Sequence, residues 1–162
     1  MTIQPLEQRH YEAVREIYEQ GIETKLATFE TSSSDWNVWD EKTMKACRIV
    51  AVDNEEVIGW AALTAVSSRC VYEGVAEVSV YIHENSRGQG LGKNLLRELI
   101  HASELEDIWT LTASIFPENK ASVKIHLDLG FEELGTRKRI AKLDGEWRDT
   151  VLLERRSEIA GR

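Results

Sequence analysis

The sequence predicts a mixed α/β domain built around one sheet. Apolar residues recur at helical spacing near 6–20 and 91–100, and apolar runs of strand length separate these segments. Two turn signals, Asp53-Asn54-Glu55-Glu56 and Asp144-Gly145, join neighbouring runs into hairpins. The chain has 162 residues, of which 42% are hydrophobic and 30% charged. This is the size of one domain, so we expect residues 1–162 to form a single unit.

The first part of the chain predicts two helices, a hairpin and a strand. We expect a helix from about Leu6 to Gln20, and the Ser- and Asp-rich stretch 31–35 predicts the N-cap of a second helix. The apolar runs 47–52 and 57–66 form the first hairpin. Residues 75–82 then predict a strand whose polar face carries Glu77, Ser79 and Tyr81.

The second part predicts a glycine-rich loop, a helix, a strand over 109–115 and a final hairpin. Strands near 137–143 and 147–155 flank Asp144-Gly145, a type I′ turn signal. The segment 119–129 supports two interpretations. Its apolar residues alternate, which is typical of a strand, whereas its length and Asn119 as a possible N-cap favour a helix. Pattern alone leaves both open.

Charge and composition exclude several classes of partner. The formal net charge is −8, and the first 60 residues carry twelve acidic against six basic side chains. An acidic chain binds a phosphate backbone poorly, so we expect no nucleic-acid partner. Neither a membrane-spanning run nor a signal pattern is present, and we expect no metal site. The two cysteines, Cys47 and Cys70, form no disulfide framework, which predicts a cytoplasmic protein.

The glycine-rich loop predicts a small-anion site. Residues 87–93 read Arg-Gly-Gln-Gly-Leu-Gly-Lys between a strand and a helix. Glycines let backbone N–H groups point inward, and the helix N-terminus adds unpaired donors, an arrangement that suits a pyrophosphate. The spacing fits neither a Walker loop nor a dinucleotide fingerprint. A glycine-rich turn without a ligand remains the alternative.

The motif Arg87-x-x-Gly90-x-Gly92 after a strand resembles the acetyl-CoA pyrophosphate loop of the GNAT N-acetyltransferases. The resemblance covers nearly the whole chain and implies a central, mostly antiparallel sheet flanked by helices. Further segments resemble the phosphinothricin and methionine sulfoximine acetyltransferase branch: Gly21-Ile22, 27–31, 76–82, Phe116-Pro117-Glu118-Asn119 with Ser122 and His126, Gly130-Phe131, and Asp144-Gly145-x-Trp147-Arg148-Asp149.

The branch implies an acetyl-CoA-dependent N-acetyltransferase that acetylates the α-amine of a small amino-acid analogue by direct transfer. It also implies a helix over 119–129 and a homodimer. Strand backbone groups would pair with the pantetheine arm, and loop N–H groups would hold the pyrophosphate. The expected cofactor-binding residues are Val80, Tyr81, Ile82, Arg87, Gly88, Gln89, Gly90, Leu91, Gly92, Lys93 and Asn119.

Glu77 and His126 are the candidate catalytic residues. Acetyl transfer to an amine needs a proton acceptor, a donor to the developing oxyanion, and a proton for the leaving thiolate. From pattern alone Glu77 is a solvated strand residue, whereas the resemblance assigns it a catalytic role. His126 is expected to act as acid or second base. A backbone N–H near Val80 is the expected oxyanion donor, and neither cysteine has a context that supports a covalent route.

The branch resemblance also implies an acceptor site. Arg69 is the candidate partner of an acceptor carboxylate, with Tyr72 and Phe29 as pocket residues. The basic run 137–139 is interpreted as a solvated strand face or as a contact to the cofactor's 3′-phosphate. Ser67 and Ser68 depart from the branch, which leaves other acceptors open: arsinothricin, a polyamine or a protein amine. A non-catalytic acyl-CoA-binding sensor is the remaining alternative.

Overall fold

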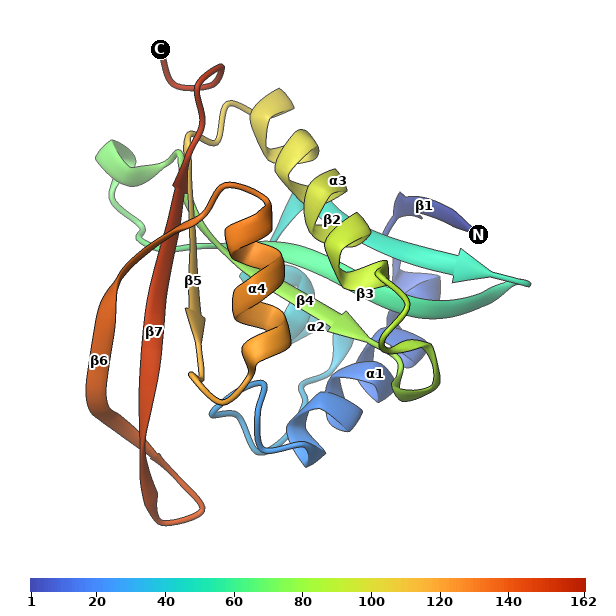
Figure 1. Ribbon diagram of the computed structural model, residues 1–162. Helices are drawn as coiled ribbons and strands as arrows, with labels where there is room; N and C mark the ends of the chain where they lie inside the picture. Colours follow the sequence, from blue (N-terminus) through green and yellow to red (C-terminus); the bar gives the residue numbers. More distant parts are fainter.

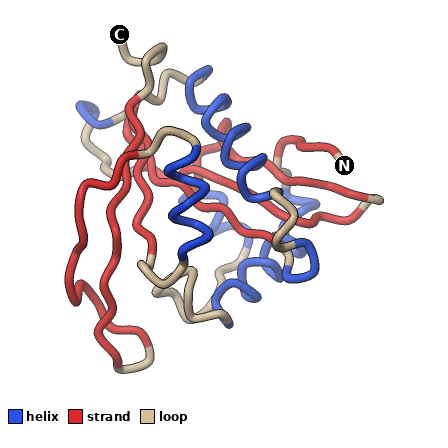
Figure 2. Tube along the Cα trace, viewed as in Figure 1, coloured by secondary structure: helices blue, strands red, loops and turns tan.

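The computed structural model describes all residues from 1 to 162. Four helices and seven strands account for most of the chain (Figure 2). The helices are α1 (Tyr11–Glu23), α2 (Trp36–Lys42), α3 (Leu91–Leu105) and α4 (Lys120–Asp128). The strands are β1 (Thr2–Pro5), β2 (Thr43–Asp53), β3 (Glu56–Ala65), β4 (Val75–Ile82), β5 (Thr110–Ile115), β6 (Glu132–Leu143) and β7 (Glu146–Arg156).

All seven strands form one sheet in the order β1-β2-β3-β4-β5-β7-β6, with helices on both faces (Figure 1). On one face, Leu95, Leu96 and Leu99 of α3 pack in the larger core cluster with Ala61 and Leu63 of β3. On the other face, the smaller cluster packs α1 against the alternate residues of the strands. Strand alternation therefore divides β3 and β4 between two apolar layers.

The centre of the sheet contains its single parallel pairing, and this pairing is short. Strands β4 and β5 are joined at Val75, Ala76 and Glu77 alone, opposite Thr110, Leu111 and Thr112. Every other neighbouring pair of strands is antiparallel. The two strands separate beyond Glu77, so one edge of β4 is left without a partner in the middle of the sheet.

The register of β4 shows which backbone groups this separation leaves free. Val66 N–H donates to the Val75 carbonyl, and His83 N–H donates to the Ile58 carbonyl, so odd-numbered residues of β4 face β3. The even-numbered residues therefore turn their N–H and C=O groups toward β5, as Gly74 does when its carbonyl accepts from Trp109 and Thr110. Val80 and Ile82 lie beyond the last β5 pair, which leaves their backbone groups free.

The predicted elements are largely confirmed. Segment 119–129 forms a helix, α4, whose N-cap Asn119 accepts from Ser122 N–H at 3.3 Å. Asp144 and Gly145 both have positive φ, +51° and +80°, as a type I′ turn requires. The first helix begins at Tyr11 rather than Leu6, because residues 8–10 form a 3₁₀ turn.

Strand β1 has no counterpart in the prediction, and β6 begins at Glu132 rather than 137. Both lie at the edges of the sheet, and most of β6 is exposed. Hydrophobic patterning is weak in exposed edge strands, so these segments carried little signal. None of the helices is long and apolar enough to cross a membrane.

Candidate active site

A cavity of about 500 Å³ lies where β4 and β5 separate. It is lined by residues from both faces of the sheet, so it runs through the gap between the two strands. The lining comes from α1 and the loop after it, β4, β5, α4, β6 and β7: Tyr18, Ala27, Thr28, Phe29, Glu30, Glu77, Val78, Ser79, Val80, Tyr81, Ala113, Ser114, Ile115, Phe116, Asn119, Ser122, His126, Arg137, Ile140, Ala141 and Thr150.

Glu77 occupies the last paired position of β4, opposite Thr112 of β5. Its side chain is accessible from the cavity, yet protein surrounds the carboxyl on several sides. This desolvation raises the pKa of Glu77, and the positive charge of Arg137 partly opposes the rise. A carboxylate with a raised pKa is a better proton acceptor than an ordinary surface glutamate.

His126 lies on α4 and is buried, with 3% of its surface exposed. Its Nδ1 is 2.7 Å from the Ser122 carbonyl oxygen. Because a carbonyl can only accept, this contact assigns the ring proton to Nδ1 and leaves Nε2 unprotonated. Nε2 is buried and has no hydrogen-bond partner in the protein. Burial lowers the pKa of His126, which keeps the ring neutral.

Asn119, Ser122 and His126 all line the cavity from one side of α4. Asn119 also donates from Nδ2 to the Leu26 carbonyl at 3.1 Å, which fixes the loop after α1 against the start of α4. That loop carries Phe29, whose ring packs edge-on against Phe116 with centroids 4.8 Å apart. One amide side chain thereby positions both a helix and a wall of the cavity.

The glycine-rich loop lies at the far end of β4. Gly88 and Gly90 have positive φ angles of +76° and +79°, and Gly90 is the N-cap residue of α3. No loop or cap hydrogen bond uses the N–H groups of residues 88–93, and the first helical donor is Asn94. These N–H groups form an anion site of the predicted kind, and the free edge of β4 leads from the cavity toward it.

The structure brings together part of the predicted site. Phe29, Glu77, Val80, Tyr81, Asn119 and His126 line the cavity. Tyr81 does so with its side chain, because its own backbone groups face β3. Arg69 and Tyr72 do not line it: they lie in or beside a 3₁₀ turn before β4, with the Arg69 guanidinium 5.6 Å from the Tyr72 ring centre.

Among the cavity residues that were not predicted as site residues, three are ionisable: Tyr18, Glu30 and Arg137. Glu30 stands beside Phe29 in a segment that carries the family resemblance, which was a usable signal. Arg137 belongs to a run of three basic residues whose individual orientations the sequence does not specify. Tyr18, Glu30 and Ser79 also line a second, adjoining cavity of about 300 Å³, together with Trp39, Lys42 and Trp60.

The model of the acetyltransferase (GNAT) family matches residues 9–131. The chain belongs to this family. A Bacillus subtilis (strain 168) protein named "putative phosphinothricin acetyltransferase YwnH" is 33% identical over 160 residues, 96% of this chain and 98% of YwnH. An L-methionine sulfoximine/L-methionine sulfone acetyltransferase of Pseudomonas aeruginosa is 32% identical over 99 residues, 61% of this chain and 58% of that protein.

Solved structures of this GNAT family share the architecture. The acetyltransferase yncA of Salmonella typhimurium, solved with its cofactor acetyl-CoA, superposes with a TM-score of 0.90 at 26% identity, covering 100% of this chain and 97% of that one. The predicted fold class, family and acyltransferase activity class are thereby confirmed.

Proposed function

We propose that this GNAT protein transfers the acetyl group of acetyl-CoA directly to the α-amine of a small amino-acid analogue of the phosphinothricin or methionine sulfoximine type. The observation that carries the proposal is a single cavity that Glu77 and His126 line together and that opens onto the free edge of β4. The named activities of the relatives in Bacillus subtilis and Pseudomonas aeruginosa support this acceptor class.

Acetyl-CoA is the acetyl donor, and it supplies an activated thioester carbonyl. Backbone groups of Val80 and Ile82 would pair with the amides of its pantetheine arm as an added strand would. The N–H groups of residues 88–93 would bind the pyrophosphate, with positive charge from Arg87 and Lys93 nearby. Asn119 lies at the cavity end of this path.

The proposed chemistry follows from the protonation states. Glu77 accepts the proton that the acceptor amine loses as its nitrogen bonds to the acetyl carbon. The carbon–sulfur bond breaks with its electron pair going to sulfur, and the CoA thiolate that leaves takes a proton from solvent. The Val80 N–H, which is free of β5, donates to the carbonyl oxygen as negative charge develops. The unprotonated Nε2 of His126 is suited to accept a hydrogen bond from a water or the acceptor amine rather than to donate one.

The two cysteines support direct transfer. Cys47 is a buried core residue on β2, and burial raises its pKa to about 11, so its thiolate is scarce at neutral pH. Cys70 is exposed in the 3₁₀ turn before β4. Neither residue lines the cavity, so neither is placed to carry an acetyl group.

The proposal also covers the oligomeric state, the cellular location and the biological role of the protein. We propose that the protein acts as a homodimer in the cytoplasm and that its activity contributes to resistance toward amino-acid-like antibiotics. In this proposal, Phe29 lines the part of the cavity that binds the acceptor. Arg69 and Tyr72 lie outside the cavity of a single chain, and their contact with the acceptor stays a prediction.

Thiol release tests this function. Wild-type protein mixed with acetyl-CoA and L-phosphinothricin or L-methionine sulfoximine is expected to release free CoA and to yield an acceptor heavier by one acetyl group. Glu77→Gln, which keeps the shape and removes the base, is expected to lower kcat roughly 100- to 10,000-fold with acetyl-CoA binding retained. Glu56→Gln, an exposed glutamate at the start of β3, is the matched control.

The outcomes separate the alternatives. Turnover with a polyamine or a peptide amine, and none with amino-acid analogues, refutes the acceptor class and keeps the chemistry. Acetyl-CoA binding without turnover of any amine points to a sensor domain. Full activity of Glu77→Gln removes Glu77 from the mechanism.

A further inference from the structure

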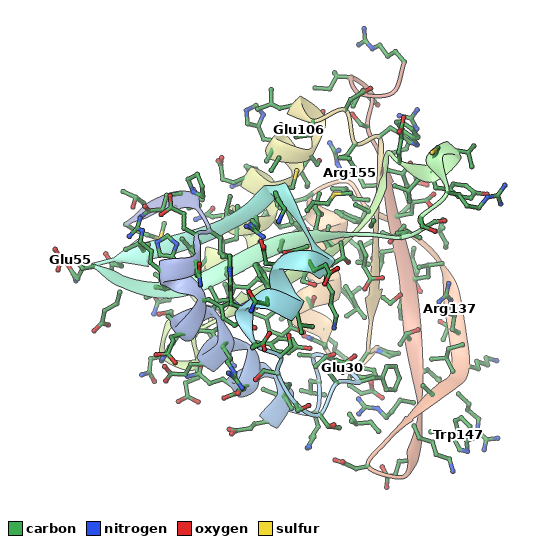
Figure 3. The ribbon with its side chains drawn as sticks, turned by 180° about the vertical axis from the view of Figure 1, so that it is seen from behind. Glu30, Glu55, Glu106, Arg137, Trp147 and Arg155 are labelled. Atoms are coloured by element: carbon green, nitrogen blue, oxygen red, sulfur yellow. The ribbon has the colours of Figure 1, made fainter.

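The cavity contains three ionisable side chains that carry charge at neutral pH: Glu30, Glu77 and Arg137. Arg137 is the sole cation among them. Glu30 and Arg137 both line the cavity, and Figure 3 shows Glu30 on the loop after α1 and Arg137 on β6. An anionic group that enters this cavity therefore meets two carboxylates that repel it and one guanidinium that attracts it.

Of the three basic residues 137–139, Arg137 alone lines the cavity, and the backbone path of β6 explains why. Arg137 pairs with Thr150 of β7, and the next pair is Ala141 with Arg148, so three residues of β6 bulge between the two pairs. Regular alternation would place Arg139 on the same face as Arg137. Instead Arg139 has a φ of +49°, its N–H donates to Asp149 Oδ1 at 2.8 Å, and its guanidinium lies 5.7 Å from the Trp147 ring centre.

The Arg137 guanidinium is not engaged by the protein. It forms no ion pair and no side-chain hydrogen bond, whereas Arg148 and Arg155 are held by Glu118 and Glu104. It lies near enough to Glu77 to lower the pKa of that carboxyl, but the two groups do not form an ion pair. Arg137 is exposed, lines the cavity and acts electrostatically on the proposed base, and none of its guanidinium N–H donors is used by another residue of the protein.

The cofactor phosphates do not explain this arginine. The phosphate-binding loop begins after Ile82, five residues beyond Glu77 on β4. At about 3.3 Å per residue, this places the loop roughly 17 Å along the strand from Glu77, the carboxyl whose pKa Arg137 lowers. An anion at Arg137 must therefore belong to the other substrate.

We propose that Arg137 is a specificity-determining residue that binds the carboxylate of the amine acceptor, by two parallel N–H···O bonds, and holds the α-amine beside Glu77. The inference rests on the proposed function, because it names how that same site recognises its acceptor. It makes the enzyme selective for amines with an adjacent carboxylate and unfavourable to polyamines, which carry no anion for Arg137 to bind.

The test compares each acceptor with its carboxamide. L-methionine sulfoximine and its α-carboxamide differ in the anionic group alone, and kcat/KM is measured for both at saturating acetyl-CoA. We expect the wild type to prefer the carboxylate, and Arg137→Gln to reduce that preference roughly 10- to 100-fold, chiefly through the KM of the acceptor. Arg137→Lys is expected to lie between them, because an ammonium keeps the charge and loses the fork.

Lys138→Gln, the neighbouring cation outside the cavity, serves as control and is expected to keep the wild-type preference. Equal Tm values for all variants would exclude misfolding as the cause. An unchanged carboxylate preference in Arg137→Gln would overturn the role of Arg137 and leave the proposed function standing. If the wild type turns over no amine, the proposed function fails. The role of Arg137 is then tested by calorimetric binding of L-methionine sulfoximine to the wild type and to Arg137→Gln. Equal affinities of the two proteins, or no binding to either, would overturn the inference.

Discussion

Glu77 and His126 lie in the same cavity, and burial acts on both by disfavouring the charged form. For the carboxyl this raises the pKa, and for the imidazole it lowers the pKa. The glutamate thus becomes a stronger base while it remains ionisable, and the histidine remains a neutral acceptor. The two residues are suited to different tasks by the same physical cause.

The pH dependence of turnover tests the electrostatics of Glu77. A base must be deprotonated, so kcat/KM is expected to rise with pH through the pKa of Glu77, at a pH above the range of an exposed glutamate. Arg137→Gln removes the charge that lowers this pKa, so the acid limb is expected to move to higher pH. Its position, rather than the height of the profile, is the measured quantity.

Two comparisons make this profile decisive. In Glu77→Gln the acid limb is expected to vanish, because no carboxyl remains to titrate. The amine of the free acceptor ionises at higher pH and forms a separate limb. An acid limb that keeps its position in Arg137→Gln would show that the two side chains do not interact.

Among the elements, α4 depends strongly on its N-cap residue, Asn119. Asn119 caps the helix and also holds the Leu26 carbonyl, so the helix start and the Phe29 loop share one side chain. Asn119→Ala is expected to lower the free energy of unfolding by about 1 kcal/mol from the lost cap and to raise the acceptor KM as the loop loosens. Chemical denaturation and steady-state kinetics measure the two effects.

The matched control for this variant is Asp35→Ala. Asp35, the last residue of the loop that carries Phe29, caps α2 by accepting from Val38 N–H at 3.0 Å, and its side chain forms no hydrogen bond to Leu26 or to α4. It is expected to cost a similar free energy without the KM effect. Equal KM changes in both variants would mean that general destabilisation, rather than the Asn119–Leu26 bond, controls the loop.

The elements differ in how well the sequence alone predicts them. Strand β4 and the second hairpin turn were predictable because alternation and turn chemistry are local properties. Segment 119–129 was not decided by pattern, because alternation along α4 places apolar residues around the helix, where several remain exposed. The place of Arg137 in the cavity could not be predicted, because it depends on a bulge in β6 at which Arg139 has a positive φ. Where such a side chain lies depends on how its strand pairs with a strand elsewhere in the sheet, and the local sequence does not show this pairing.

For the whole molecule, the three-residue joint between β4 and β5 holds the two halves of the sheet together at its centre. A ligand that pairs with the free edge of β4 would add contacts that only the folded state offers. Acetyl-CoA at about 100 times its Kd is therefore expected to stabilise the protein by about 2.7 kcal/mol and to raise Tm by roughly 5–10 °C. Tryptophan fluorescence and circular dichroism are expected to give one common Tm, as a single unit requires.

NAD is the control ligand for this measurement, because it also carries a pyrophosphate but no pantetheine arm. It is expected to leave Tm nearly unchanged. A rise with NAD and none with acetyl-CoA would contradict the assignment of the glycine-rich loop to coenzyme A.

The free edge of β4 has a consequence for how the protein tolerates sequence change and avoids aggregation. An exposed strand edge normally invites pairing with another chain. Here the edge is enclosed, because α4 stands over the gap between β4 and β5 and lines the cavity there (Figure 1). The unbranched pantetheine arm is narrow enough to enter the gap between β4 and β5. A second β-strand carries side chains on both faces, and those on one face would collide with α4. The proposed pairing with the pantetheine arm uses main-chain groups, so substitutions at Val80 and Ile82 that keep the core packed are expected to leave acetyl-CoA binding intact.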